Sequence, residues 1–237
     1  MRNQNKPIAE EGYPFIGLFA FVTLVFAMLD WGFLTLLLLA LTLFTIYFFR
    51  NPERLVPGGE NLVVAPADGK VIFVGDVDES RYFNERVTKV SIFMNVFNVH
   101  VNRAPCDGKV VDMYYQKGEF LNASLDKAAD CNEQAGILLE TAGGSKIMFV
   151  QIAGLVARRI VTYPVIGDLL ERGMRYGLIR FGSRVDIYFP KGSNVAVTLG
   201  ETTVAGETVL GTLPLSRSRT NLISVRTCAK GFMFCRT

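Results

Sequence analysis

The chain contains a single histidine, His100, in the segment 95–103 (Asn-Val-Phe-Asn-Val-His-Val-Asn-Arg). If this segment is extended, side chains alternate, so His100 shares a polar face with Asn98 and Asn102. An imidazole has an ordinary pKa of about 6.5, which makes it the natural proton carrier at neutral pH. A structural histidine is the alternative. One histidine excludes multi-histidine metal sites, and we expect no metal.

Two other residues could act together with His100. Asp68 precedes Gly69, where a carboxylate commonly bonds the backbone of its own turn; alternatively, it orients a histidine as in a catalytic triad. Ser183 follows Gly182, and Gly-Ser is a common turn dipeptide, so spacing alone does not identify a nucleophile. The known motifs for serine hydrolases, phosphate loops, thiol pairs, zinc proteases and dinucleotide binding are absent. An Asp68–His100–Ser183 set is therefore one hypothesis.

The apolar residues of the chain are concentrated near the N-terminus. Between Tyr13 and Phe49 the only charged residue is Asp30. A single helix over this stretch would be about 55 Å long, which exceeds the ~30 Å hydrocarbon core of a bilayer. Because Asp30-Trp31-Gly32 interrupts the run, we predict a membrane helical hairpin over residues 13–49, within an anchoring segment of residues 1–54. One long tilted helix and a signal sequence are the alternatives, but no signal cleavage site follows.

Positive charges flank this apolar run on both sides, at Arg2, Lys6, Arg50 and Arg54. The central interruption has no Lys or Arg, so the positive-inside rule places both ends of the hairpin in the cytoplasm. The rest of the chain would then lie on the cytoplasmic side. No cysteine pair has the C-x-x-C spacing, and the four cysteines predict no disulfide framework; they are Cys106, Cys131, Cys228 and Cys235.

Short apolar runs rich in Val and Ile follow, separated by turn signals such as Asp68-Gly69 and Asp107-Gly108. We predict a mainly β (α+β) fold: a compact antiparallel sandwich or barrel over residues 55–214, with one short helix near 122–131 and a frayed basic tail over 215–237. The nearly balanced charge of +3 argues against a nucleic-acid binder. The predicted strands are 62–64, 70–74, 87–93, 109–114, 136–140, 146–152, 184–189 and 195–199.

One phrase occurs twice. Residues 65–71 and 104–110 both read A-P-x-D-G-K-V. A reused β-turn explains the repeat, since x-Pro-x-Asp-Gly before a valine strand is favourable turn chemistry. The phrase is also found in small barrel-sandwich domains of the biotinyl and lipoyl kind, so a non-catalytic, membrane-anchored binding module is an alternative function.

Several collinear blocks together resemble the phosphatidylserine decarboxylase family, in particular its short prokaryotic form. The resemblance extends over more than 130 residues, which is far more specific than any single motif. Its blocks are F-R-N-P-E-R at 49–54, A-P-A-D-G at 65–69, N-V-H-V-N-R at 98–103, F-L-N-A at 120–123, Q-I-A-G-L-V-A-R-R-I at 151–160 and G-L-I-R-F-G-S-R at 177–184.

Members of that family make a covalent pyruvoyl cofactor from their own chain. By this resemblance, the Ser183 hydroxyl attacks the Gly182 carbonyl, and elimination then splits the chain at Gly182-Ser183. The products are a large chain, 1–182, and a small chain, 183–237, whose N-terminal serine becomes pyruvoyl. His100, oriented by Asp68, would activate Ser183.

The resemblance also implies the reaction that the cofactor carries out. The pyruvoyl ketone would form a Schiff base with the amine of phosphatidylserine, and CO₂ would leave to give phosphatidylethanolamine, with His100 returning the proton. The expected partners are the lipid substrate and the cell (inner) membrane, while a homo-oligomer is left open. A family member that self-cleaves but takes another amine-bearing carboxylate is a further alternative. Many relatives have a second histidine where this chain has Arg103, so His100 would serve both steps or another residue would assist cleavage.

Overall fold

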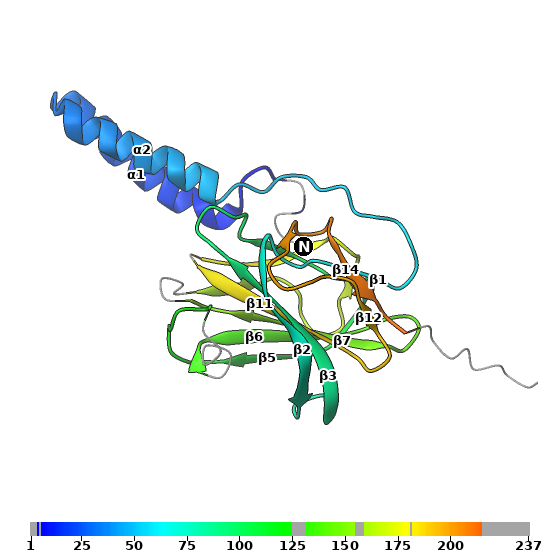
Figure 1. Ribbon diagram of the computed structural model, residues 1–237. Helices are drawn as coiled ribbons and strands as arrows, with labels where there is room; N and C mark the ends of the chain where they lie inside the picture. The colour runs from blue at the N-terminus through cyan, green and yellow to red at the C-terminus, as the bar shows by residue number, and fades with distance from the viewer. Residues whose placement is uncertain (1–3, 5, 125–130, 155–158, 181, 215–237) are drawn as a thin grey trace, which may run out of the picture.

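The computed structural model describes residues 4, 6–124, 131–154, 159–180 and 182–214. Two helices, α1 (Tyr13–Met28) and α2 (Gly32–Phe48), form an antiparallel hairpin that projects from a β domain (Figure 1). A short 3-10 turn, η1 (Glu10–Gly12), precedes α1. The chain reverses at Asp30, whose φ of 60° lies in the left-handed region that Asp tolerates better than most residues.

Both helices are apolar around their whole circumference. No residue of α1 is buried, and α2 buries only Thr42, Thr45 and Phe48. The two helices approach each other at Thr23 and Thr42, whose hydroxyl oxygens are 3.3 Å apart. By length and composition, the helical stretch Glu10–Met28 could cross a membrane, whereas α2 is shorter. Helices that are hydrophobic on every side belong in a protein core or in lipid, and except for the end of α2 at Phe48 these two lie outside the core.

The β domain is built on one curled, eight-stranded antiparallel sheet (Figure 1). Its strand order is β13-β2-β3-β11-β7-β6-β5-β9. The bounds are β2 (Gly69–Glu79), β3 (Glu85–Met94), β5 (Gly108–Gln116), β6 (Gln134–Glu140), β7 (Lys146–Ile152), β9 (Leu169–Leu170), β11 (Ser183–Phe189) and β13 (Thr202–Thr203).

Two three-stranded antiparallel sheets accompany the large one, in the orders β1-β14-β12 and β4-β10-β8. Their strands are β1 (Leu62–Val64), β4 (Val101–Arg103), β8 (Ile160–Thr162), β10 (Arg175–Ile179), β12 (Asn194–Val195) and β14 (Val209–Thr212). The strand β4 carries the histidine segment into the domain, and β10 leads toward Gly182 and Ser183.

The repeated A-P-x-D-G-K-V phrase corresponds to a repeat in the fold. One copy leads into β2 at Gly69 and the other into β5 at Gly108, and these strands occupy equivalent places in the two halves of the large sheet. The residue before each copy also bonds to the proline of the other copy. Val64 N–H donates to the Pro105 carbonyl at 2.8 Å, and Arg103 N–H donates to the Pro66 carbonyl at 2.9 Å. The phrase is therefore a turn used twice.

The central strand β11 separates two environments. Val185, Ile187 and Phe189 point into the main hydrophobic core. Arg184 and Asp186 alternate with them, and both are almost completely buried in a two-pronged ion pair with N–O distances of 2.5 and 2.9 Å. Arg184 also donates to the Ser91 hydroxyl at 2.9 Å. Partnering of this kind is what allows charges to be buried at all.

Buried arginines attach the segment after α2 to the domain. Arg175 donates to the Asn51 side chain at 2.6 Å and to Glu53 at 2.9 Å. Arg103 donates to the Pro52 carbonyl at 2.6 Å and to the Gly173 carbonyl at 2.8 Å. Because each guanidinium presents several donors in a fixed plane, these contacts fix how the hairpin meets the β domain.

The predicted fold class is confirmed: the chain is mainly β and antiparallel, with an N-terminal helical hairpin. The predicted strand over 195–199 is wrong. Strand β12 ends at Val195, and the chain turns near Gly200, whose φ is +89°, while Glu201 accepts a hydrogen bond from the Thr198 N–H. Residues 125–130 of the predicted short helix, and the basic tail over 215–237, lie outside the described residues.

Removing one member of the buried ion pair should destabilise the fold strongly. We expect Asp186→Asn to lower the free energy of unfolding by about 3–5 kcal/mol, because Arg184 would stay buried without a counter-charge. Denaturant unfolding of the detergent-solubilised protein measures this. The matched control is Glu10→Gln, which breaks the exposed Lys6–Glu10 pair and should leave the midpoint almost unchanged. If both substitutions lowered the free energy of unfolding equally, the buried Arg184–Asp186 pair would not contribute more to stability than an exposed pair, contrary to this prediction.

Candidate active site

Ser183 is the first residue of β11 and is completely buried, opposite Met94 of β3. Among the described residues, its hydroxyl oxygen has no hydrogen-bond partner. Leaving a buried hydroxyl unpaired costs about 1–3 kcal/mol, and such groups usually have a functional explanation. The preceding residue, Gly182, has a φ of +56°, which residues with a side chain rarely adopt. The backbone therefore enters β11 through a conformation that glycine adopts readily and other residues do not, directly before the Ser183 hydroxyl.

The carbonyl of Gly182 lies against the bare Cα of Gly154. A Cβ added to Gly154 would lie 1.9 Å from that carbonyl oxygen, so only glycine fits. Asn132, which is fully buried, holds the neighbouring backbone: its Nδ2 donates to the Ala153 carbonyl at 2.7 Å and to the Leu121 carbonyl at 2.8 Å. Three segments far apart in sequence therefore meet at the Gly182–Ser183 peptide.

His100 is 2 % exposed, and the ring of Phe48 covers it. The two ring centroids are 4.2 Å apart, with an interplanar angle of 33°. The imidazole Nδ1 is 2.9 Å from the Asn98 carbonyl oxygen, and Nε2 has no hydrogen-bond partner in the part of the chain that the structure describes. Because a carbonyl oxygen can only accept, Nδ1 must be the protonated nitrogen. The neutral ring then presents a bare lone pair at Nε2.

The surroundings of His100 keep it neutral. Burial lowers its pKa to about 4, and the nearby positive charge of Arg50 acts in the same direction; the bond to the Asn98 carbonyl opposes them. At neutral pH the imidazole can therefore accept a proton at Nε2, and a proton placed there would be released readily.

The triad hypothesis requires the Asp68 carboxylate to accept from His100, but Asp68 binds other groups. One carboxylate oxygen accepts from the Ala205 N–H at 2.7 Å, and the other accepts from Arg54 at 2.8 Å. In the second copy of the repeated phrase, Asp107 accepts from the Arg172 N–H at 2.8 Å. Both aspartates therefore accept from a backbone N–H of a distant segment rather than of their own turn, and Asp68 additionally binds Arg54 in the segment after α2. The Nδ1 position of His100 is taken by a backbone carbonyl instead.

The strands bring His100 and Ser183 to the same part of the β domain. The Ile179 N–H donates to the His100 carbonyl at 3.3 Å, four residues before Ser183. Asn102, two residues after His100, has its Nδ2 3.6 Å from the sulfur of Met94, the cross-strand partner of Ser183. The Gln151 amide in turn donates to the Asn102 side chain at 2.8 Å. Buried polar contacts therefore join Asn102 and Gln151, which lie close in the chain or across the sheet to His100 and Ser183.

Arg103, at the position where the family resemblance implies a second histidine, makes structural contacts. Its two terminal nitrogens donate to backbone carbonyls, as described above. Burial lowers its pKa to about 10, with Arg175 and Arg54 contributing, so it remains a cation at neutral pH. It therefore cannot act as a base in place of a histidine.

Several residues of this site carry no signal of their own in the sequence. Phe48, the Asn98 carbonyl and Asn132 were not singled out, because a phenylalanine, a carbonyl and an asparagine become informative only through their neighbours in space. Gly154 lies in one of the blocks that carry the resemblance, but spacing does not indicate what its Cα touches. Within the described ranges, no group of three His, Cys, Asp or Glu side chains could hold a metal ion.

Known proteins match this chain closely. The family described as phosphatidylserine decarboxylase matches residues 41–211. A protein of Syntrophotalea carbinolica, named phosphatidylserine decarboxylase proenzyme, is 65 % identical over 213 residues, covering 90 % of this chain and all of the relative. Proteins with the same name from Geobacter sulfurreducens and Geotalea uraniireducens are 57 % and 56 % identical, each over 90 % of this chain and all of the relative.

The depressed pKa of His100 makes stability depend on pH in a defined direction. Between pH about 6.5 and about 4 the unfolded chain binds a proton at this site and the folded chain does not, so stability falls as the pH decreases through that window. The contribution, present in full above pH about 6.5, is about 3 kcal/mol. Denaturant unfolding at several pH values should show that the free energy of unfolding of His100→Gln falls less between pH about 6.5 and about 4 than that of the wild type. Parallel curves for the two proteins would contradict the assignment.

Proposed function

Since the chain belongs to the phosphatidylserine decarboxylase family, we propose that it decarboxylates phosphatidylserine with a pyruvoyl group made from its own Ser183. The observation that supports this most directly is the buried, unpartnered Ser183 hydroxyl beside the Gly182 carbonyl, which is packed against Gly154. The chain is a carboxy-lyase by family, so the non-catalytic binding module is not favoured.

The first step is self-cleavage. The Ser183 oxygen bonds to the Gly182 carbonyl carbon, the peptide C–N bond breaks, and the serine proton moves to the amide nitrogen, giving an ester. Elimination across Cα–Cβ of residue 183 releases the Gly182 carboxylate and leaves dehydroalanine, and water then replaces its nitrogen, which leaves as ammonia. His100 Nε2 is the base we assign to the serine proton. Gly182 adopts its positive φ without steric cost, and its lack of a side chain leaves the carbonyl carbon open to the serine oxygen.

The site suits a small group derived from Ser183. Gly154 brings no side chain to it, and nothing lies within 4 Å of a Cβ built on Gly182. The pyruvoyl group would supply a ketone that binds the substrate amine covalently and accepts the electron pair of the breaking bond. His100 would return a proton to the substrate carbon after CO₂ leaves. Its low pKa favours that donation, because a cationic imidazole buried there is a strong acid.

The two products of cleavage would stay together. β11 is paired with β3 along one side and with β7 along the other. A small chain beginning at residue 183 would therefore remain the central strand of a sheet formed by a large chain ending at residue 182. On this basis we divide the precursor into an anchor (1–54), a catalytic domain (55–214) and a basic tail (215–237).

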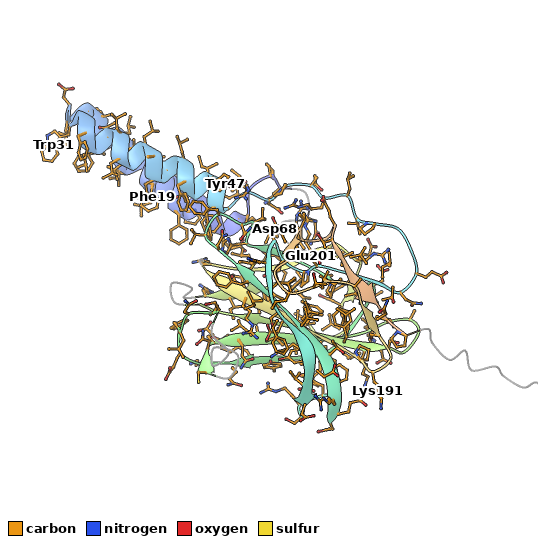
Figure 2. The ribbon with its side chains drawn as sticks, in the orientation of Figure 1. Phe19, Trp31, Tyr47, Asp68, Lys191 and Glu201 are labelled. Atoms are coloured by element: carbon orange, nitrogen blue, oxygen red, sulfur yellow. The ribbon has the colours of Figure 1, made fainter. Side chains whose placement is uncertain are left out.

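The hairpin would hold the enzyme at its lipid substrate. Figure 2 shows Trp31 at the far tip and Tyr47 where the hairpin meets the domain, the two levels at which amphipathic aromatics favour membrane interfaces. The helices are about 24–26 Å long, close to the ~30 Å hydrocarbon core. With the basic flanks at this end, the catalytic domain would lie on the cytoplasmic side of the cell (inner) membrane.

Cleavage should depend on Ser183 and on the space beside Gly154. We expect Ser183→Ala to remain one chain on denaturing gels, because the attacking oxygen is gone. Gly154→Ala should slow cleavage at least tenfold, since its Cβ would displace the Gly182 carbonyl. Gly58→Ala is the matched control, because a Cβ there meets nothing within 4 Å, and it should cleave normally. A Ser183→Ala protein that still splits would rule out this chemistry.

Membrane attachment should depend on the apolar surface of the hairpin. We expect Leu24→Lys with Leu36→Lys to shift the protein from membranes to the soluble fraction after alkaline extraction. A lysine at a helix centre costs about 2.5–3.5 kcal/mol on insertion scales. Leu199→Lys, at a similarly exposed leucine of the β domain, is the control and should stay membrane-bound. If the double variant also stays bound, the hairpin is not the anchor.

A further inference from the structure

Two arginines face each other at the end of the β8–β10 ladder. Ile179 pairs with Ile160, and the next pair along is Arg180 with Arg159, whose backbones are joined by an N–H to carbonyl contact of 3.4 Å. Like charges at directly opposite positions of a sheet destabilise it. Arg180 lies three residues before Ser183. A bound anion at this position would offset the repulsion between the two arginines.

The pair has unused capacity to bind an anion. The Nε of Arg180 is buried and has no hydrogen-bond partner among the described residues. Burial together with the charge of Arg159 lowers the pKa of Arg180. The negative charge of Glu11 raises the pKa of Arg180. The Glu11 carboxylate also accepts a hydrogen bond from the Tyr163 hydroxyl at 3.3 Å. In the described part of the chain, neither arginine is in an ion pair.

The pair also lies at the base of the helical hairpin. The Arg180 guanidinium lies over the ring of Phe15, 5.2 Å from its centroid, at the base of α1. Phe15 stacks on Phe49, Phe49 contacts Phe48, and Phe48 covers His100. A continuous row of aromatic rings thus connects Arg180 with His100 where the hairpin meets the domain.

We propose that Arg159 and Arg180 bind the phosphodiester of the lipid substrate, which rests on the proposed function. Arginine's planar fork suits phosphate oxygens, and such charge-assisted bonds are strong. The substrate's other anion, its carboxylate, leaves as neutral CO₂. An arginine paired with the carboxylate would stabilise the ground state more than the transition state and slow the reaction. The phosphate keeps its charge throughout, so it is the group that two arginines can bind without this penalty.

Water-soluble headgroup analogues test the assignment without a membrane. Glycerophosphoserine contains the phosphodiester and serine does not, so the ratio of their inhibition constants against decarboxylation in neutral detergent micelles isolates the phosphate contribution. We expect the wild-type enzyme to prefer glycerophosphoserine, and Arg159→Gln and Arg180→Gln each to lose about tenfold or more of that preference. KM for the lipid should rise more than kcat falls, and Arg→Lys should restore part of the preference.

Controls separate this proposal from simpler effects. Arg81→Gln removes another arginine that lies over an aromatic ring, that of Tyr114, and should leave the preference unchanged. Each variant is first checked for cleavage on a gel; if Arg180→Gln is uncleaved, the exposed Arg159→Gln decides.

An unchanged ratio in cleaved, active variants overturns the assignment while leaving the decarboxylase function intact. The assignment is also overturned if the variants lose only binding to phosphatidylglycerol vesicles and keep the ratio of inhibition constants. That result would mean that the pair binds the anionic membrane surface. Wild-type protein that neither cleaves nor decarboxylates would instead refute the function itself.

Discussion

The packing of Phe48 on the His100 imidazole is the contact on which the site depends. Phe48 ends the second helix of the hairpin, and His100 enters the β domain at the start of β4. The contact removes water from the ring, so the imidazole is neutral, and the Asn98 carbonyl determines which nitrogen carries the proton. The end of the helical hairpin thereby forms one wall of the candidate active site.

Contacts elsewhere in the molecule hold Phe48 in place against His100. Arg175, Arg103 and Asp68 bind the segment just after the hairpin, so the helices cannot rotate freely on the domain. On the other side, the eight-stranded sheet holds Ser183 and Gly154 in adjacent strands or at their ends. The proposed anchor, the proposed base His100 and the Gly182–Ser183 peptide are consequently held by one connected set of contacts.

Local features of the sequence were predictable, and contacts between distant segments were not. The break at Asp30-Trp31-Gly32 and the β class follow from local hydropathy, alternation and turn chemistry. The strand proposed for 195–199 failed because one Glu201–Thr198 contact turned an apolar run into a loop. The repeated A-P-x-D-G-K-V phrase indicated a turn, but not that its two copies pair with each other. For Asp68, the sequence could not show that Arg54 rather than His100 would be its charged neighbour.

The central claim is that the base of the hairpin holds His100 as a neutral, Nδ1-protonated imidazole, and nitrogen NMR of the only histidine tests it most directly. Uniformly ¹⁵N-histidine-labelled enzyme in detergent gives a single imidazole, free of assignment ambiguity. We expect the Nδ1–H tautomer from pH 5 to pH 8 without titration, and Phe48→Ala to bring the pKa back toward its ordinary value of about 6.5. A wild-type ring that titrates near pH 6.5, or carries its proton on Nε2, would contradict the account.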